Sequence, residues 1–177
     1  MNKFLHSLIK HSPQRGQSLV EMSISLLVIL MLLVGAVDFG MAFFSFSAIR
    51  DAAQEGALYG SINGDKSGTL SQATIDNICA RVRETSTNNP VHLNGDDYKA
   101  NCNSGVTSGN YILVELAPDA ASGGKDCQGL VGADTNGIKV TVGYDYPTIM
   151  PFLGRLIGSQ TIQLRATAVD TILTPQC

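Results

Sequence analysis

The chain has 177 residues, enough for one domain with a single core of moderate size. It carries 12 basic and 15 acidic residues, for a net charge of −3, and Lys3, Lys10 and Arg15 lie within the first 16 positions, which hold no acid. Without those positions the balance is 9 − 15 = −6, and such an acidic remainder without clustered lysine or arginine argues against nucleic acid as a partner.

The first element is a basic, polar leader followed by an apolar run. Residues 22–37 carry no charge and neither do residues 39–49, so only Asp38 interrupts a stretch long enough for the ~20 residues that span a bilayer. No proline breaks the run before residue 59. Because the basic residues precede it, the positive-inside rule predicts a cytoplasmic N-terminus and an exported remainder.

Three interpretations of this run are possible. A cleaved secretory signal has an apolar core of about 7–15 residues, which is shorter than the run found here. A signal anchor would hold the chain in the membrane permanently. A filament subunit would insert the helix into the membrane first and later pack it against the helices of sister subunits.

Two acids bear on the choice between an anchor and a filament subunit. A carboxylate at the centre of a spanning helix costs about 2.5–3.5 kcal/mol, so such groups usually face a partner. Asp38 lies about 25 Å beyond Glu21 along a helix, so it either reaches the opposite interface or has a buried role, and both remain open. Glu21 is placed five residues after Gly16, and this spacing favours a function.

Small and aromatic residues in the run indicate close packing. Gly35 and Gly40, with Ala36 and Ala42, would let a neighbouring helix approach closely. Four phenylalanines between residues 39 and 46 supply bulk for a helix bundle. Contact with lipid explains the phenylalanines equally well, as an interfacial aromatic belt, whereas the glycines favour helix packing over lipid contact.

Beyond the run, helix is expected to continue to about residue 60, where a turn-forming segment supplies a stop. Asp51 and Glu55 are expected to face solvent on this helix. A second helix is predicted over residues 71–84, because its apolar residues recur at helical spacing. These residues are Ile75, Ile78, Cys79 and Val82.

Three strands are predicted after the second helix, over residues 111–116, 138–146 and 162–168. The last two alternate apolar and polar residues, as half-buried strands do. The apolar segment 147–158 is either a short helix covering the sheet or a surface patch. The fold class is therefore α+β, with a long N-terminal hydrophobic helix and a small globular domain in which one further helix packs on an antiparallel sheet.

Four cysteines follow the apolar run: Cys79, Cys102, Cys127 and Cys177. None forms a CxxC pair, which argues against zinc and thioredoxin-like chemistry. An even number in an exported domain favours disulfides, and four cysteines allow three pairings. Because Cys102 and Cys127 lie in loops that a crosslink would restrain, the expected pairing is Cys102–Cys127 with Cys79–Cys177.

The residue inventory argues against an enzyme. His92 is the only histidine after the leader, and the chain contains no GxSxG motif, HExxH motif or glycine-rich phosphate loop with its lysine. Asp96 and Asp97 adjoin on a turn rich in asparagine and glycine, as solvated residues do. We therefore expect no catalytic residue, no metal and no cofactor.

The motifs resemble those of a known family. Residues 16–21, GQSLVE, are similar to a type IV prepilin processing site, with glutamate at the fifth position after the scissile bond. Residues 35–40 (GAVDFG) and 52–57 (AAQEGA) resemble TadE-like proteins of the tight-adherence (Flp) pilus system. The tail extends this resemblance at residues 140–147, 151–153 and 164–168.

The resemblance implies a processing event and an assembly contact. A prepilin peptidase would cut between Gly16 and Gln17 on the cytoplasmic side, and Glu21 would neutralise the new amine of Gln17 in a neighbouring subunit. Opposite charges in a low dielectric favour each other's charged forms. The implied organisation is a leader over residues 1–16, a long helix over residues 17–60 and an exported α+β domain over residues 61–177.

The implied function is that of a structural subunit of a Tad-like surface filament used for adhesion or attachment. The size of the exported domain favours a minor pilin or pseudopilin, although a main subunit remains open. The alternatives are an uncleaved, single-pass assembly component and an anchored surface binding module. The implied partners are other copies or other pilins, prepilin peptidase, the Tad-type assembly machinery in the inner membrane and membrane lipid.

Overall fold

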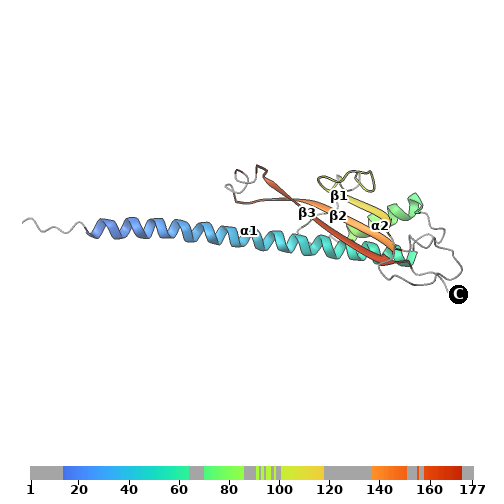
Figure 1. The fold of residues 1–177 in the computed structure, drawn as a ribbon, viewed down its shortest axis with the longest axis horizontal. Helices are drawn as coiled ribbons and strands as arrows, with labels where there is room; N and C mark the ends of the chain where they lie inside the picture. The colour runs from blue at the N-terminus through green and yellow to red at the C-terminus, as the bar shows by residue number, and fades with distance from the viewer. Residues whose placement is uncertain are drawn as a thin grey trace, which may run out of the picture. The chain divides into compact units, whose positions relative to one another are not determined.

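A computed structural model describes residues 14–63, 70–85, 101–117, 137–150 and 158–172, together with residues 91, 93, 95, 96, 98 and 155. Its elements are α1 (Gln14–Asn63), α2 (Gln72–Thr85), β1 (Tyr111–Ala117), β2 (Gly137–Pro147) and β3 (Thr161–Thr171), shown in Figure 1. The chain divides into two compact units, Met1–Phe39 and Gly40–Cys177, and α1 contributes to both. The predicted α+β arrangement is confirmed.

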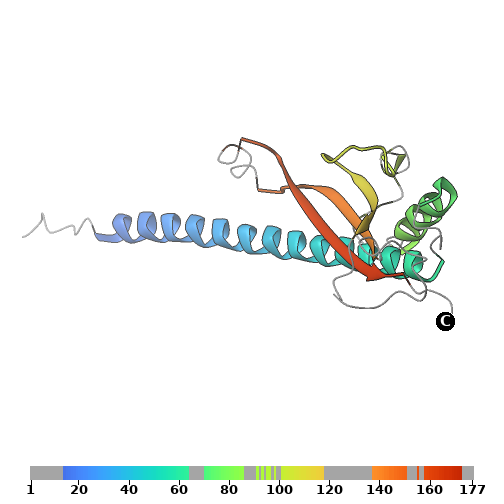
Figure 2. The same cartoon turned by 45° about the vertical axis from the view of Figure 1, so that its right-hand side comes forward.

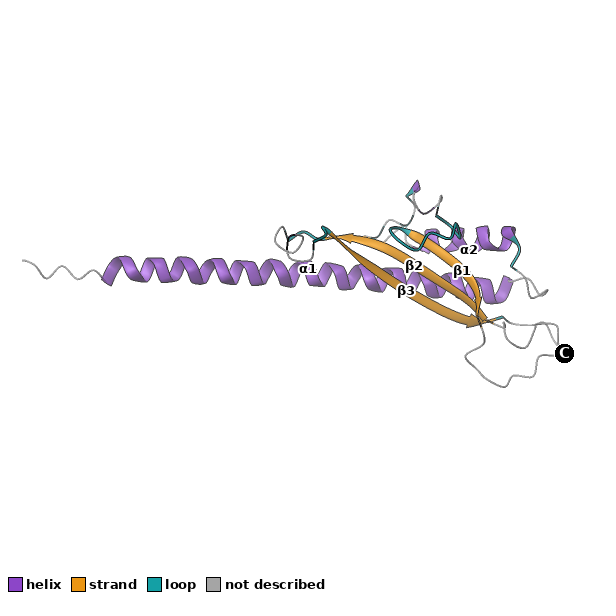
Figure 3. Ribbon diagram, turned by 45° about the horizontal axis from the view of Figure 1, so that its top comes forward, coloured by secondary structure: helices purple, strands orange, loops and turns teal. Residues whose placement is uncertain are grey.

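The three strands of the second unit form an antiparallel sheet in the order β1-β2-β3 (Figure 3). Val140 of β2 pairs with Val114 of β1 and with Ala168 of β3, so this register aligns apolar side chains on one face. That face, with Ile112, Ile138 and Val142, forms part of the hydrophobic core. The alternation predicted for β2 and β3 is therefore present, with their apolar faces directed inward.

The C-terminal part of α1 packs on this core through a row of small residues. Ala48, Ala52, Ala53 and Ala57 are buried at 0–5% exposure and recur at helical spacing. A Cβ atom at Gly60 would lie 2.9 Å from both Ile78 Cδ1 and Ile138 Cδ1, which is too close for an unperturbed contact. From residue 52 to residue 60 every buried residue of α1 is alanine or glycine, which lets α2 and the sheet approach its backbone.

Helix α2 lies beside the C-terminal turns of α1, at an incline in the view of Figure 2, and runs in the opposite chain direction. Gly56 faces Val82, whereas Gly60 faces Ile78 earlier in α2. The four residues predicted to form the buried face of α2 are buried, at 0–6% exposure. Ser71 accepts a hydrogen bond from the backbone N–H of Thr74 at 3.3 Å, an N-terminal cap that begins the helix beside the predicted position.

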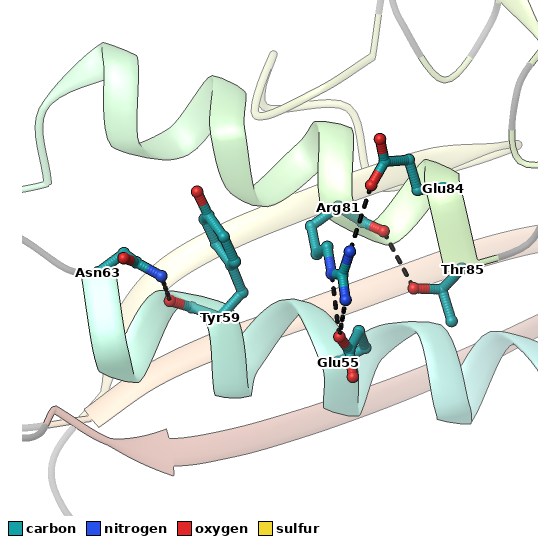
Figure 4. Close-up of polar contacts among 6 residues, drawn as sticks. All are labelled: Glu55, Tyr59, Asn63, Arg81, Glu84 and Thr85. Carbon is teal, nitrogen blue, oxygen red and sulfur yellow. Dashed lines mark hydrogen bonds and ion pairs between the residues drawn. The ribbon is translucent and has the colours of Figure 1, made fainter.

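A polar contact also joins α2 to α1 (Figure 4). Arg81 donates from Nε and Nη2 to Glu55 Oε1, at 2.9 and 2.6 Å, and from Nη1 to Glu84 Oε2 at 3.3 Å. Hydrogen bonding to Glu55, then its charge, raises the pKa of Arg81. The expectation that Glu55 simply faces solvent is therefore wrong, because α2 brings a guanidinium to it, whereas Asp51 is exposed as expected.

The outer face of the sheet carries a row of three residues across its strands. Tyr111, Gly143 and Arg165 are paired in register, and the ring of Tyr111 occupies the space that a side chain at residue 143 would take. The guanidinium of Arg165 lies 5.7 Å from the ring centroid, within the range of a cation–π contact. Tyr98, which precedes β1 in the sequence, donates a hydrogen bond from its hydroxyl to the Gly143 carbonyl at 2.9 Å.

The disulfide prediction is wrong in its pairing. Cys79 of α2 is bonded to Cys102, 23 residues later, so neither Cys102–Cys127 nor Cys79–Cys177 forms. The physical reason is the path of the chain before β1: Cys102 forms a parallel bridge with Ile112, and this bridge brings Cys102 to the buried face of α2. Cys127 and Cys177 lie outside the described residues, as does half of the segment 147–158 (residues 151–154, 156 and 157).

Candidate functional site: the N-terminal helix

The part of α1 in the first unit has an apolar surface on every side. Its large apolar side chains, from Leu19 to Phe39, are 41–74% exposed. Small or polar residues interrupt them without forming a polar face. A helix that is apolar all round is stable in a membrane or among other helices, because water solvates such a surface poorly.

Length and composition allow this helix to cross a membrane. The most hydrophobic window of 18 residues, within Gly16–Asn63, has a mean hydropathy of 2.5, and none of it is buried. A helix belonging to the core of a water-soluble domain would be mostly buried. The described residues therefore leave this surface for lipid or for another chain.

The predicted processing motif lies at the start of α1. Gln17 donates from Nε2 to Glu21 Oε1 at 3.3 Å, one turn later, and both residues are exposed. Gly16 is helical, and a Cβ atom there would meet no atom of another part of the described chain within 4 Å. The structure thus brings Gln17 and Glu21 together within one chain and leaves the surroundings of Gly16 open.

Cleavage after Gly16 would convert this turn into a new helix end. The backbone N–H groups of the first four residues of a helix have no partner within it, and the dipole makes that end positive. A free α-amine at Gln17 adds a further positive charge. The carboxylate of Glu21, within the first five residues of the shortened helix, is the negative charge nearest to these groups in the described sequence.

The residues predicted to pack helices differ in their surroundings. Asp38 is 4% exposed, and its two predicted roles, at the opposite membrane interface or as a buried functional group, both stay predictions. Gly35 is half-buried, whereas Gly40 is exposed, with no atom within 4 Å of an added Cβ. Gly40 thus leaves the backbone of α1 open to close approach by another helix.

Two contacts that hold the C-terminal part of α1 against the rest of the second unit could not be predicted from the sequence. The row of small residues from Ala48 to Gly60 was visible as an alanine- and glycine-rich stretch, but it predicted only helix propensity. Arg81, which holds Glu55, is a single arginine on the predicted second helix and carries no local signal of a distant partner.

Comparison with known proteins supports the motif-based resemblance. A model of the family described as TadE-like protein matches residues 16–58, which include the processing motif, the apolar run and the alanine-rich part of α1. Neither a search of curated proteins nor one of solved structures finds a match. Over residues 16–58 the chain is therefore similar to TadE-like proteins.

Proposed function

We propose that this chain is a structural subunit of a Tad-like surface filament, a minor pilin or pseudopilin matured by prepilin peptidase between Gly16 and Gln17. The TadE-like match over residues 16–58 associates the chain with Tad pili. The observation that carries the proposal is the exposed apolar surface of α1, with Glu21 near its N-terminal end. Such a helix can be held by lipid before assembly and by sister helices afterwards.

The Cys79–Cys102 disulfide supports an exported C-terminal unit. Disulfides persist in oxidising compartments and are rare in the cytosol. The basic leader independently favours a cytoplasmic N-terminus. The proposed topology therefore has one span, with Gly16 at the cytoplasmic face and the sheet outside.

The pairing of Glu21 with the new amine of Gln17 would make assembly depend on cleavage. In the uncut chain the residue-17 nitrogen is an amide without charge, so a neighbour's Glu21 would remain an uncompensated carboxylate. Removing one partner of a buried ion pair costs about 3–5 kcal/mol. The pair would also set the axial step between subunits, because only one offset brings the two groups together.

One observation favours a second candidate, an uncleaved single-pass assembly component. Gly16 and Gln17 are both within α1, and a helical peptide bond is a poor protease substrate because its carbonyl is hydrogen-bonded and its side chains crowd the backbone. The first turn of a helix frays readily, which is how the filament proposal accommodates cleavage here.

Isolation of the surface filaments tests the proposal. Filaments sheared from the producing cell and purified should contain this chain, identified by mass spectrometry, at a low ratio to the main subunit. Filaments that lack the chain, while the membrane fraction retains all of it, would support the anchored component instead. A dominant amount in the filaments would make it the main subunit.

A further inference from the structure

The face of α1 opposite the core, within the second unit, combines exposed apolar residues with an uncompensated pair of charges. We define this outward face as Phe43, Phe44, Arg50, Asp51, Gln54 and Leu58. Phe43 is 63%, Phe44 55% and Leu58 48% exposed, although the core covers the opposite side of the same turns. Exposed apolar side chains clustered on one element are typical of a contact surface.

The two charges at its centre have no partner within the chain as far as the structure describes it. The side chains of Arg50 and Asp51 are exposed and make no hydrogen bond or ion pair with a described residue. Their neighbour Glu55, by contrast, is held by Arg81. An open hollow of about 210 Å³ lies over the two charges. It is lined by Phe43, Phe46, Ser47, Arg50, Asp51 and Gln54.

Helix geometry separates the outward face into two flanks. Consecutive residues on an α-helix point about 100° apart, and residues seven apart lie on nearly the same side. Phe43 and Arg50 therefore form one flank, and Phe44, Asp51 and Leu58 form the other. Each flank carries one charge beside apolar bulk, and the two charges have opposite signs.

We infer that these flanks bind each other between copies of this chain, with Arg50 of one copy paired to Asp51 of the next. The inference rests on the proposed function for the parallel orientation of the helices, which a shared membrane imposes. Because the two flanks are different surfaces, each copy keeps one flank unused when the other is bound. Such a heterologous contact generates an open array when an axial step between copies, as proposed above for Glu21 and Gln17, keeps the ring from closing.

Charge complementarity selects a second copy as the occupant. Lipid could cover the phenylalanines but would leave the adjacent opposite charges without matching partners. A second copy supplies a guanidinium for every carboxylate and a carboxylate for every guanidinium. Complementary charges of this kind fix register and exclude wrong partners.

Charge exchange tests the contact. Full-length chains in their native membrane are treated with an amine-reactive cross-linker, and the ladder of oligomers is compared with the amount of chain in sheared filaments. R50D places two carboxylates on every copy and D51R two guanidinium groups, so each variant alone should form at least about tenfold less ladder, because like charges across a contact cost several kcal/mol. The double variant R50D/D51R should restore the ladder.

Co-expression of the two single variants is the decisive arm. One copy would then carry carboxylates at both positions of the pair and the other copy guanidinium groups at both, so the mixture should recover the ladder that neither variant forms alone. A folding defect within a chain could not be rescued in this way. Wild-type ladders from both single variants, no recovery in the mixture, or dimers without higher oligomers would each overturn the inference.

Leu58 provides an apolar test with a matched control. Leu58→Glu should reduce the ladder by about tenfold or more, since a charge would replace a side chain that is buried only between copies. Val169→Glu, on the outer face of β3, changes a residue of equal exposure, 47% against 48%, and should leave the ladder unchanged. Equal losses in both variants would contradict the contact. Ladders from a wild-type chain that is missing from the filaments would refute the proposed function while leaving this contact intact.

Discussion

Gln17 donates a side-chain hydrogen bond to Glu21 across one turn of α1, with Nε2 and Oε1 3.3 Å apart. Glu21 thus has a neutral partner in its own chain, and the proposal gives it a charged partner in another. These two roles make different demands on residue 21. The hydrogen bond needs an acceptor oxygen, whereas neutralisation of an amine needs a negative charge.

Two substitutions at residue 21 separate these roles. Glu21→Gln keeps the acceptor oxygen and the size but removes the charge, and Glu21→Ala removes both. Loss of one member of a buried ion pair costs about 3–5 kcal/mol, so both variants should enter filaments at least about 100-fold less than wild type. The amount in the membrane fraction, measured by immunoblot, should not change. Normal incorporation of the glutamine variant would show that the charge is not required.

Gly16→Leu should block maturation. The space around Gly16 is open, with no atom within 4 Å of an added Cβ, and leucine is a good helix former, so the side chain fits α1 without distortion. Failure to cut would therefore reflect recognition by the peptidase. Intact-mass measurement should find the variant 16 residues longer than the mature wild type. Identical masses for the two proteins would place the cut elsewhere or exclude one.

The Cys79–Cys102 disulfide should contribute about 3 kcal/mol to the stability of the C-terminal unit, as expected for a loop of this length. Cys102→Ala removes the bond with little loss of packing, because Cys102 is half-buried. Cys79→Ala loses the same bond, so the double variant C79A/C102A should cost less than the sum of the two single variants. Urea denaturation of the full chain in detergent gives the free energy of unfolding of each variant. Costs that simply add would show that the two cysteines act independently.

Gly56 and Gly40 form a matched pair within α1. Alanine in place of glycine normally stabilises a helix by up to about 1 kcal/mol, and Gly40→Ala should do so because its surroundings are open. Gly56→Ala should instead destabilise the fold by about 1–3 kcal/mol, since its Cβ would overlap Val82 Cγ2. The melting temperatures of the two variants, measured by thermal unfolding in detergent, test this difference.

Val82→Ala provides the control for this clash. Shortening Val82 removes the overlapping methyl group, so the cost of G56A/V82A should be smaller than the sum of the single costs. If the stability costs of the two single substitutions simply added in the double variant, Gly56 and Val82 would not be in contact between α1 and α2.

Local sequence patterns predicted the elements of the fold because these depend on periodicity. The apolar spacing of α2 and the alternation along β2 and β3 recur in the structure within a few residues of the predicted bounds. The end of α1 lies at Asn63, three residues beyond the expected stop, because Gly60 is used for close packing against Ile78 and Ile138. A glycine that admits a neighbour looks the same in sequence as one that ends a helix.

Long-range contacts were not accessible in the same way. The disulfide pairing was wrong because loop position says nothing about which helix the chain before β1 approaches. Glu55 was expected to face solvent, since its partner Arg81 is 26 residues away on another helix. The burial of Asp38, at 4% exposure, likewise depends on tertiary structure. The motif around Gly16 and Glu21 could be recognised because it is contiguous.

The N-terminal sequence of the chain recovered from purified filaments tests the central claim most directly. The account predicts that this material begins at Gln17, with a free α-amine, and that the uncut form is found only in the membrane. Filament-borne protein that still begins at Met1 would contradict it, because no charged amine would then be present for Glu21 to neutralise.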